Sequence, residues 1–151
     1  MKEFDNIDAI LVFAIEQEQK AVDFYTELAR EAHSEEMKNV FIEFAGEEIK
    51  HKQRLTRIRE EGVFTMPTEK VADLKIADYV VEVKTGGKLS YEEALVVAMK
   101  REKAAFRLYT TLAERAPNQQ LREVFQSLAM EESRHKLRFE LEYDEYVLRE
   151  N

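Results

Sequence analysis

The 151 residues, 44% of them hydrophobic, are enough to bury about two thirds of the unfolded surface in one core, so we expect a single domain over residues 1–151. The net charge of −8 argues against nucleic-acid binding, which needs a patch of Lys and Arg, and the absence of Cys excludes disulfides and thiolate-bound metals. No apolar run approaches the roughly 20 residues that cross a bilayer, and "MKEFDNID" lacks the apolar segment of a signal peptide, so we expect a cytoplasmic protein that binds no membrane.

Helix caps and breakers predict a first pair of helices. With only 4 Gly and 2 Pro, and with Ala, Glu, Lys, Leu and Arg frequent, the composition is typical of an all-α protein. The first helix is expected to begin after Asp5 or Asn6 and to run to about Ala32. Ser34 can cap a second helix that continues to Gly62. The short link between the two helices predicts a helical hairpin.

A long connection follows at residues 63–89, which include "FTMPTEK" and "KTGGK". A helix of about 25 residues is about 38 Å long, and these 27 residues could extend past that length. We therefore interpret the segment as a crossover that returns the chain to the far end of a bundle. The piece "DYVVEV" within it is compatible with a strand or a helical turn.

The second pair of helices begins with a capping box, "SYEE", in which Ser90 and Glu93 can satisfy each other's backbone N–H groups. This third helix is expected to stop at Pro117, and Asn118 can cap a fourth. The pattern predicts a second helical hairpin.

The two hairpins are copies of one another. Shifting the sequence by 84 residues aligns 11–54 with 95–138 without a gap, and 18 of these 44 positions are identical. A shared amphipathic pattern is the alternative explanation, but charged and aromatic positions agree as well as apolar ones. The repeat therefore indicates two equivalent halves.

Positions spaced alternately by three and four residues mark the face of each helix that points into a bundle. Along these four stripes the residues are mostly Leu, Ala, Phe, Met, Ile and Tyr. Six ionisable side chains interrupt them: Glu18, Glu48, His51, Glu102, Glu132 and His135. Each lies near the middle of its helix, so in an antiparallel bundle the six are expected to meet in one central layer.

Four buried carboxylates repel one another and each is costly to desolvate, so the layer needs compensating positive charge. Two divalent cations would neutralise the four Glu, with the two imidazoles completing the coordination. A Glu and a His at i and i+3 share one helical face, as in the two "E-x-x-H" units that begin at Glu48 and Glu132. One such unit alone is usually a salt-bridging surface turn, and a metal-free interaction bundle is the competing hypothesis. Two units at repeated positions predict a dinuclear metal site.

These two units, each preceded by a helix with a lone inward Glu and a following Tyr ("EQKAVDFY" and "EKAAFRLY"), resemble the ferritin-like di-iron proteins of the rubrerythrin group. The resemblance implies a ferritin-like four-helix bundle made of two repeated hairpins joined by a long crossover. For the metal ligands it implies bridging roles for Glu48 and Glu132, terminal roles for Glu18 and Glu102, and one metal each for His51 and His135. Tyr25 and Tyr109 would donate hydrogen bonds to ligand carboxylates and are the candidate catalytic residues.

Proteins of this group typically pass electrons to peroxide or dioxygen at an iron pair, and the resemblance implies the same chemistry here. The ligand types suit two Fe ions, with Mn or Zn possible in their place. Rubrerythrins carry a rubredoxin domain with four Cys, which this sequence lacks, so the electrons are expected from an external donor protein such as a rubredoxin. Rubrerythrins also have a further Glu one turn after the ligand of the third helix, where Ala105 and Phe106 stand here. A ferroxidase or iron-storage protein is the alternative function, and a homodimer is the expected assembly.

Three other polar residues lie outside the set of six. Glu47 and Glu131 repeat beside the inward stripe, and they are either partly exposed or hydrogen-bonded behind the metal ligands. His33, at the turn between the first two helices, is expected to be a solvated loop residue.

Overall fold

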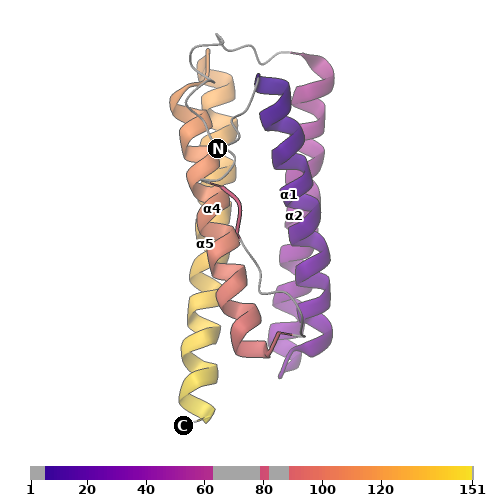
Figure 1. The fold of residues 1–151 in the computed structure, drawn as a ribbon, viewed down its shortest axis with the longest axis vertical. Helices are drawn as coiled ribbons and strands as arrows, with labels where there is room; N and C mark the ends of the chain where they lie inside the picture. The colour runs from indigo at the N-terminus through magenta and orange to yellow at the C-terminus, as the bar shows by residue number, and fades with distance from the viewer. Residues whose placement is uncertain (1–5, 63–78, 82–88, 151) are drawn as a thin grey trace.

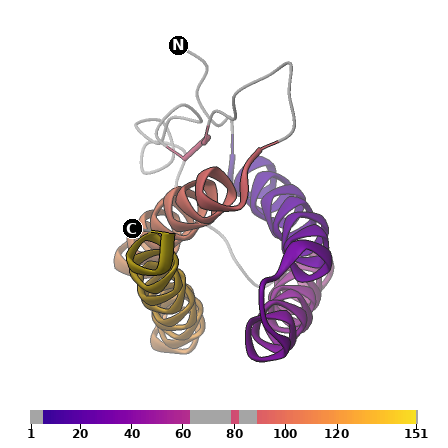
Figure 2. The same ribbon diagram turned by 90° about the horizontal axis from the view of Figure 1, so that it is seen from below.

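The computed structural model describes residues 6–62, 79–81 and 89–150. These residues form four helices, α1 (Ile7–Glu31), α2 (Glu35–Glu61), α4 (Tyr91–Glu114) and α5 (Gln119–Glu150). Helix α1 packs on α2 and α4 on α5, giving two hairpins that lie side by side with α1 against α4 (Figures 1 and 2). The fold is therefore all-α, as predicted, and none of the helices in the described ranges is both long and apolar enough to cross a membrane.

The helix ends follow the predicted caps. The Asn6 side chain accepts a hydrogen bond from the Ala9 N–H at 2.8 Å, and Ser34 accepts one from the Met37 N–H at 3.1 Å. Gly62 ends α2 with φ 61°, a left-handed conformation that glycine adopts without steric cost. At the start of α4, Ser90 and Glu93 form both hydrogen bonds of the capping box.

The start of α5 is capped in the same way, because Asn118 Oδ1 accepts a hydrogen bond from the Leu121 N–H at 2.9 Å.

The predicted connection at residues 63–89 lies mostly outside the described residues. Its described part, Tyr79–Val81, contains a turn and no strand or helix. The "DYVVEV" piece therefore contains a turn and no strand over its three described residues, and its other residues lie outside the described part of the chain.

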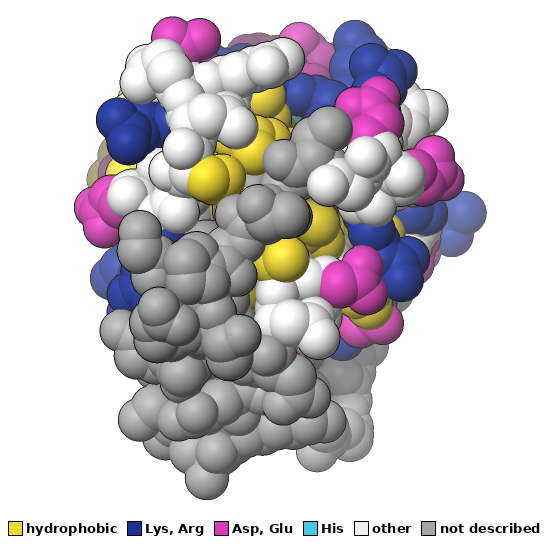
Figure 3. Space-filling view, turned by 90° about the horizontal axis from the view of Figure 1, so that it is seen from above, with side chains coloured by type: hydrophobic (Ala, Val, Ile, Leu, Met, Phe, Trp, Pro, Cys, Tyr) yellow, Lys and Arg dark blue, Asp and Glu magenta, His cyan; other side chains and the backbone are white. Residues whose placement is uncertain are grey.

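The apolar core is divided in two along the bundle axis. One cluster contains the first half of α1 and the second half of α2, represented by Leu11 and Leu55. The other contains the opposite halves, represented by Leu28 and Phe41. On all four helices the predicted ionisable residues fall between the two clusters. The polar layer is thus sealed from both ends of the bundle by hydrophobic packing, and at the end shown in Figure 3 hydrophobic side chains gather at the centre with charged ones at the rim.

The turn between α1 and α2 lies beside an aromatic cluster at one end of the bundle. His33 in this turn is exposed, and its ring lies 4.5 Å from the ring of Tyr91 and 5.1 Å from that of Tyr146. The Tyr91 hydroxyl donates a hydrogen bond of 2.8 Å to Glu142, a buried carboxylate. His33 is therefore a solvent-exposed loop residue, as predicted, which also contacts the rings of Tyr91 and Tyr146.

Candidate metal centre

The six predicted side chains come together in one buried layer. Each is 2% exposed or less, although four are carboxylates, and each projects from the inward face of its helix as the alternating spacing predicts. These residues are Glu18 on α1, Glu48 and His51 on α2, Glu102 on α4, and Glu132 and His135 on α5.

The layer consists of two overlapping groups of possible ligands. In each group the ligand atoms lie within 4.8 Å of one another. Glu48 and Glu132 belong to both groups, whereas Glu18 and His51 belong only to one, and Glu102 and His135 only to the other. This arrangement has the geometry expected for two metals that share two carboxylates.

The shortest contacts in the layer run between the two hairpins. His51 Nδ1 on α2 lies 2.9 Å from Glu132 Oε1 on α5, and His135 Nδ1 on α5 lies 3.1 Å from Glu48 Oε1 on α2. The two imidazole rings are nearly parallel, with an interplanar angle of 9° and centroids 6.3 Å apart. The site is therefore built equally by both halves of the repeat.

Burial changes the protonation of the carboxylates. Burial, followed by the charges of neighbouring carboxylates, raises the pKa of Glu48 and of Glu132 well above the usual range. Burial also raises the pKa of Glu102 to about 8. For Glu18, burial acts to raise the pKa, but contacts with His51 and Glu48 lower it overall. The layer thus retains protons at neutral pH unless cations take their place.

Buried polar atoms without hydrogen-bond partners indicate whether the layer could hold metal ions. Each of the six residues has a buried atom with no hydrogen-bond partner among the described residues: Glu18 Oε2, Glu48 Oε1, Glu102 Oε2, Glu132 Oε1, His51 Nδ1 and His135 Nδ1. Leaving so many buried polar atoms unpaired would be costly. Carboxylate oxygens and imidazole nitrogens are the ligands of Fe, Mn and Zn, and two dications would balance four carboxylates. The buried clusters therefore fit a dinuclear metal site.

Two further carboxylates lie behind the histidines. His135 Nε2 lies 2.5 Å from Glu47 Oε2, and Arg134 contacts the other oxygen of Glu47 at 2.6 Å. Burial acts to raise the pKa of Glu47, but hydrogen bonds with His135 and Arg134 lower it overall, so Glu47 is an ionised acceptor. The proton of a neutral His135 must then be on Nε2, which leaves the lone pair of Nδ1 facing the layer.

The other half of the repeat has a looser version of this arrangement. Glu131 Oε2 lies 3.5 Å from His51 Nε2 without hydrogen-bonding to it, and Arg54 holds Glu131 at 3.2 Å. Sequence reasoning left open whether Glu47 and Glu131 are exposed or lie behind the ligands. The structure places both behind the histidines, and their repetition at positions next to Glu48 and Glu132 was the signal for it.

Replacing Glu47 with Ala is expected to weaken metal binding about 10- to 100-fold, because His135 loses the acceptor that fixes its tautomer and ring orientation. The measurement is a competitive titration of Zn²⁺ against a chelator. Glu43→Ala, which removes an exposed carboxylate from the same helix, is the matched control and should bind as tightly as the wild type. Equal affinities for the two variants would contradict the role given to Glu47.

The two predicted tyrosines each contact a carboxylate of the opposite hairpin. The Tyr109 hydroxyl on α4 donates to Glu18 Oε1 at 2.5 Å, and the Tyr25 hydroxyl on α1 donates to Glu102 Oε1. Burial and the nearby carboxylate charges raise the pKa of both phenols well above the usual range, so both remain hydrogen-bond donors. Both are positioned to orient a ligand carboxylate, and their catalytic role stays a prediction.

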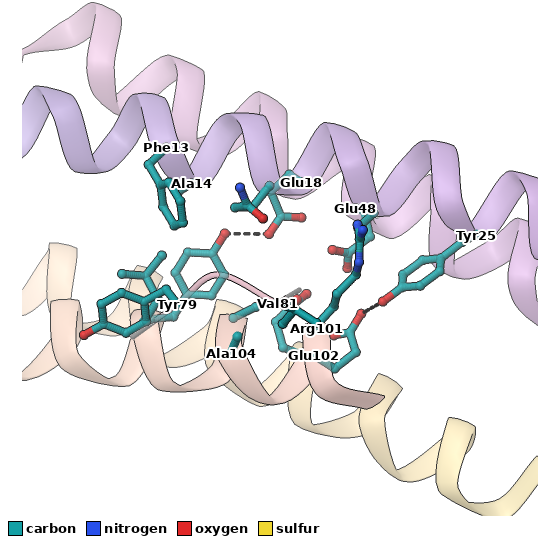
Figure 4. Close-up of a pocket in the computed structure, with 16 residues that line it drawn as sticks. Phe13, Ala14, Glu18, Tyr25, Glu48, Tyr79, Val81, Arg101, Glu102 and Ala104 are labelled. Carbon is teal, nitrogen blue, oxygen red and sulfur yellow. Dashed lines mark hydrogen bonds between the residues drawn. The ribbon is translucent and has the colours of Figure 1, made fainter. Parts of the chain in front are cut away.

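A small pocket leads to the layer between α1 and α4 (Figure 4). Its volume is about 30 Å³, room for a ligand of only a few atoms. Its walls include Glu18, Glu48, Glu102 and Glu132, the two tyrosines, and Tyr79 and Val81 from the connection between the hairpins. Arg101 also lines the pocket, but it lies off the inward stripe of α4, so helical periodicity did not single it out.

Comparisons with known proteins agree with this geometry. The family model described as rubrerythrin matches residues 9–88 and 93–151. The chain is also similar to a solved structure from Thermotoga maritima, assigned there as a ferritin-like diiron-carboxylate protein, with 22% identity and a TM-score of 0.78. The alignment covers 97% of this chain and 99% of that one. It shows that the fold is the predicted ferritin-like bundle of two hairpins. No curated protein matches the chain significantly.

Proposed function

The chain belongs to the rubrerythrin family, and from that premise we propose that it reduces hydrogen peroxide or dioxygen at a pair of iron ions, with electrons from a separate donor protein. The observation that carries the proposal is the buried layer, in which six potential ligands each have a polar atom without a hydrogen-bond partner among the described residues. Two Fe ions are the proposed cofactor, and Mn or Zn could be bound by the same ligands.

The proposed ligand roles follow the overlap of the two groups. Glu48 and Glu132, which belong to both groups, would bridge the metals. Glu18 with His51, and Glu102 with His135, would each complete the coordination of one metal. When bound, the metals would supply Lewis acidity and electrons for the reduction.

The protein contributes orientation, proton control and exclusion of water. Tyr25 and Tyr109 hold Glu102 and Glu18 in place, and each hydroxyl keeps a proton at the wall of the pocket. Glu47 keeps the proton of His135 on the side away from the layer. The ring of Phe44 stacks on His135 at 4.0 Å and shields the layer from solvent on that side. The pocket is only about 30 Å³ even without metals, which supports small substrates such as peroxide or dioxygen over larger organic molecules.

Electron supply is assigned to a second protein because the 151 residues contain no Cys that could hold an iron–sulfur centre. A rubredoxin is one class of protein that could fill this role.

The proposed assembly is a homodimer, and size-exclusion chromatography tests it. A large closed shell of many copies would instead favour the ferroxidase or iron-storage function.

The experiment that tests the proposal is anaerobic stopped-flow mixing of the diferrous protein with hydrogen peroxide or with dioxygen. Oxidation by peroxide is expected to be faster at equal concentration, and a rubredoxin with a reductant should sustain several turnovers. Oxidation by peroxide no faster than by dioxygen, together with formation of an iron core, would favour ferroxidase activity and contradict peroxide reduction.

A further inference from the structure

Arg101 places a cation in the wall of the metal-centre pocket. It precedes Glu102 on α4, and its guanidinium carbon lies 5.0 Å from the centroid of the Phe24 ring on α1. A guanidinium over an aromatic face is held by a cation–π interaction. The side chain thus spans the gap between α1 and α4 on the side where the pocket lies (Figure 4).

This cation differs from the other basic residues near the layer. Arg54 and Arg134 form ion pairs with Glu131 and Glu47. Arg101 forms no ion pair with any described residue, and its buried Nε has no hydrogen-bond partner in the described part of the chain. A buried guanidinium N–H without an acceptor is destabilising unless a ligand provides one.

Charge balance indicates what kind of ligand that is. Four carboxylates and two dications sum to zero, and the pairs of Arg54 with Glu131 and of Arg134 with Glu47 also sum to zero. Arg101 leaves one positive charge without a partner. A monoanion in the pocket would restore neutrality and accept a hydrogen bond from the buried Nε of the half-buried Arg101, whereas a neutral molecule would leave this charge unpaired.

The internal repeat shows that the charge of Arg101 is not part of the repeated set of potential metal ligands. The repeat partner of Arg101 is Gln17, which lines the same pocket without charge, and the partner of Phe24 is Leu108, which has no aromatic face. All six potential ligands and both tyrosines are the same in the two halves, but the cation and its aromatic support occur in one half only. A purely structural requirement of the bundle would apply to both halves.

We propose that Arg101 makes the pocket selective for small monoanions, binding and orienting a species of two or three heavy atoms such as hydroperoxide or azide beside the carboxylate layer. The proposal rests on the proposed function, because it assumes that two metals neutralise the layer. It assigns to Arg101 a positioning role that neither the ligands nor the tyrosines provide. The pocket of about 30 Å³, which four of the potential metal ligands also line, has room only for a small anion.

The experiment compares a charged probe with a neutral one. Azide and nitric oxide are each titrated into the diferrous protein, in which two dications balance the four carboxylates, and both affinities are measured by absorption and near-infrared circular dichroism spectroscopy. Arg101→Gln, which installs the residue of the other half of the repeat, is expected to weaken azide binding about 10- to 100-fold and to change nitric oxide binding by less than about 3-fold. Arg101→Lys, which keeps the charge, should recover part of the lost azide affinity.

Lys100→Gln is the matched control, because it removes an exposed cation from the same helix outside the pocket, and its azide affinity should stay within about 2-fold of the wild type. Unchanged azide affinity in Arg101→Gln, or equal losses for azide and nitric oxide, would overturn the role of Arg101. Iron content and thermal unfolding of each variant identify loss of the site itself. Slow peroxide reduction by a wild type that binds azide through Arg101 would instead contradict the proposed function alone.

Discussion

Replacing Glu132 with Ala is expected to lower the metal content from two ions per chain to fewer than one. Glu132 belongs to both groups of potential ligands, so its loss removes a ligand from each of two sites at once. It also leaves His51 without its shortest contact in the layer, the one of 2.9 Å. The measurement is elemental analysis of protein purified without chelators.

The control for this experiment uses a residue that belongs to one group only. Glu18→Ala should impair one metal site more than the other, and the exposed Glu43→Ala should keep the wild-type metal content. Undiminished metal content in Glu132→Ala would rule out the shared-carboxylate arrangement.

The second large effect concerns pH. In the metal-free protein, the free energy of unfolding is expected to fall by a few kcal/mol as the pH rises from about 5 to about 8. Burial raises the pKa of Glu102 from 4.5 to about 8 in the folded state, so over this range the folded protein binds more protons than the unfolded chain. The sign follows directly, since stability decreases with pH wherever the folded state holds the extra proton.

His51 contributes in the same direction at higher pH. Burial acts to lower its pKa, but contacts with Glu132 and Glu18 raise it to about 11, above the ordinary value of 6.5. Its stabilising contribution is therefore complete below pH 6.5 and is lost as the pH rises toward 11. Both groups make the metal-free protein more stable in mild acid than in mild base.

Metal-loaded protein should show the opposite trend between pH 5 and 8, because protons compete with metal ions for the same carboxylates and imidazoles. Urea unfolding at several pH values, with either a chelator or excess Zn²⁺, tests both expectations. Glu102→Gln in the presence of chelator should flatten the pH dependence. A metal-free protein that gains stability from pH 5 to 8 would contradict the raised pKa of the layer.

Local features of the sequence determined the helices and the composition of the site. Caps such as Ser34 and Asn118 act within one helical turn, so their hydrogen bonds could be predicted from neighbouring residues. The alternating spacing of three and four fixes which side chains share the inward face of a helix. Because each ionisable residue lies near the middle of its helix, the convergence of the six into one layer could also be predicted.

Only the tertiary structure decided which groups meet. Helical periodicity says that Glu132 and His51 face inward, but not that they contact each other across the hairpins, since the relative position of α2 and α5 depends on packing between distant segments. The same limit applies to Arg101, whose place in the pocket depends on Phe24 from another helix. The surroundings of a side chain at the edge of the inward face are set by the neighbouring helix and not by its own, so the place of Arg101 could not be predicted and that of Glu47 was left open.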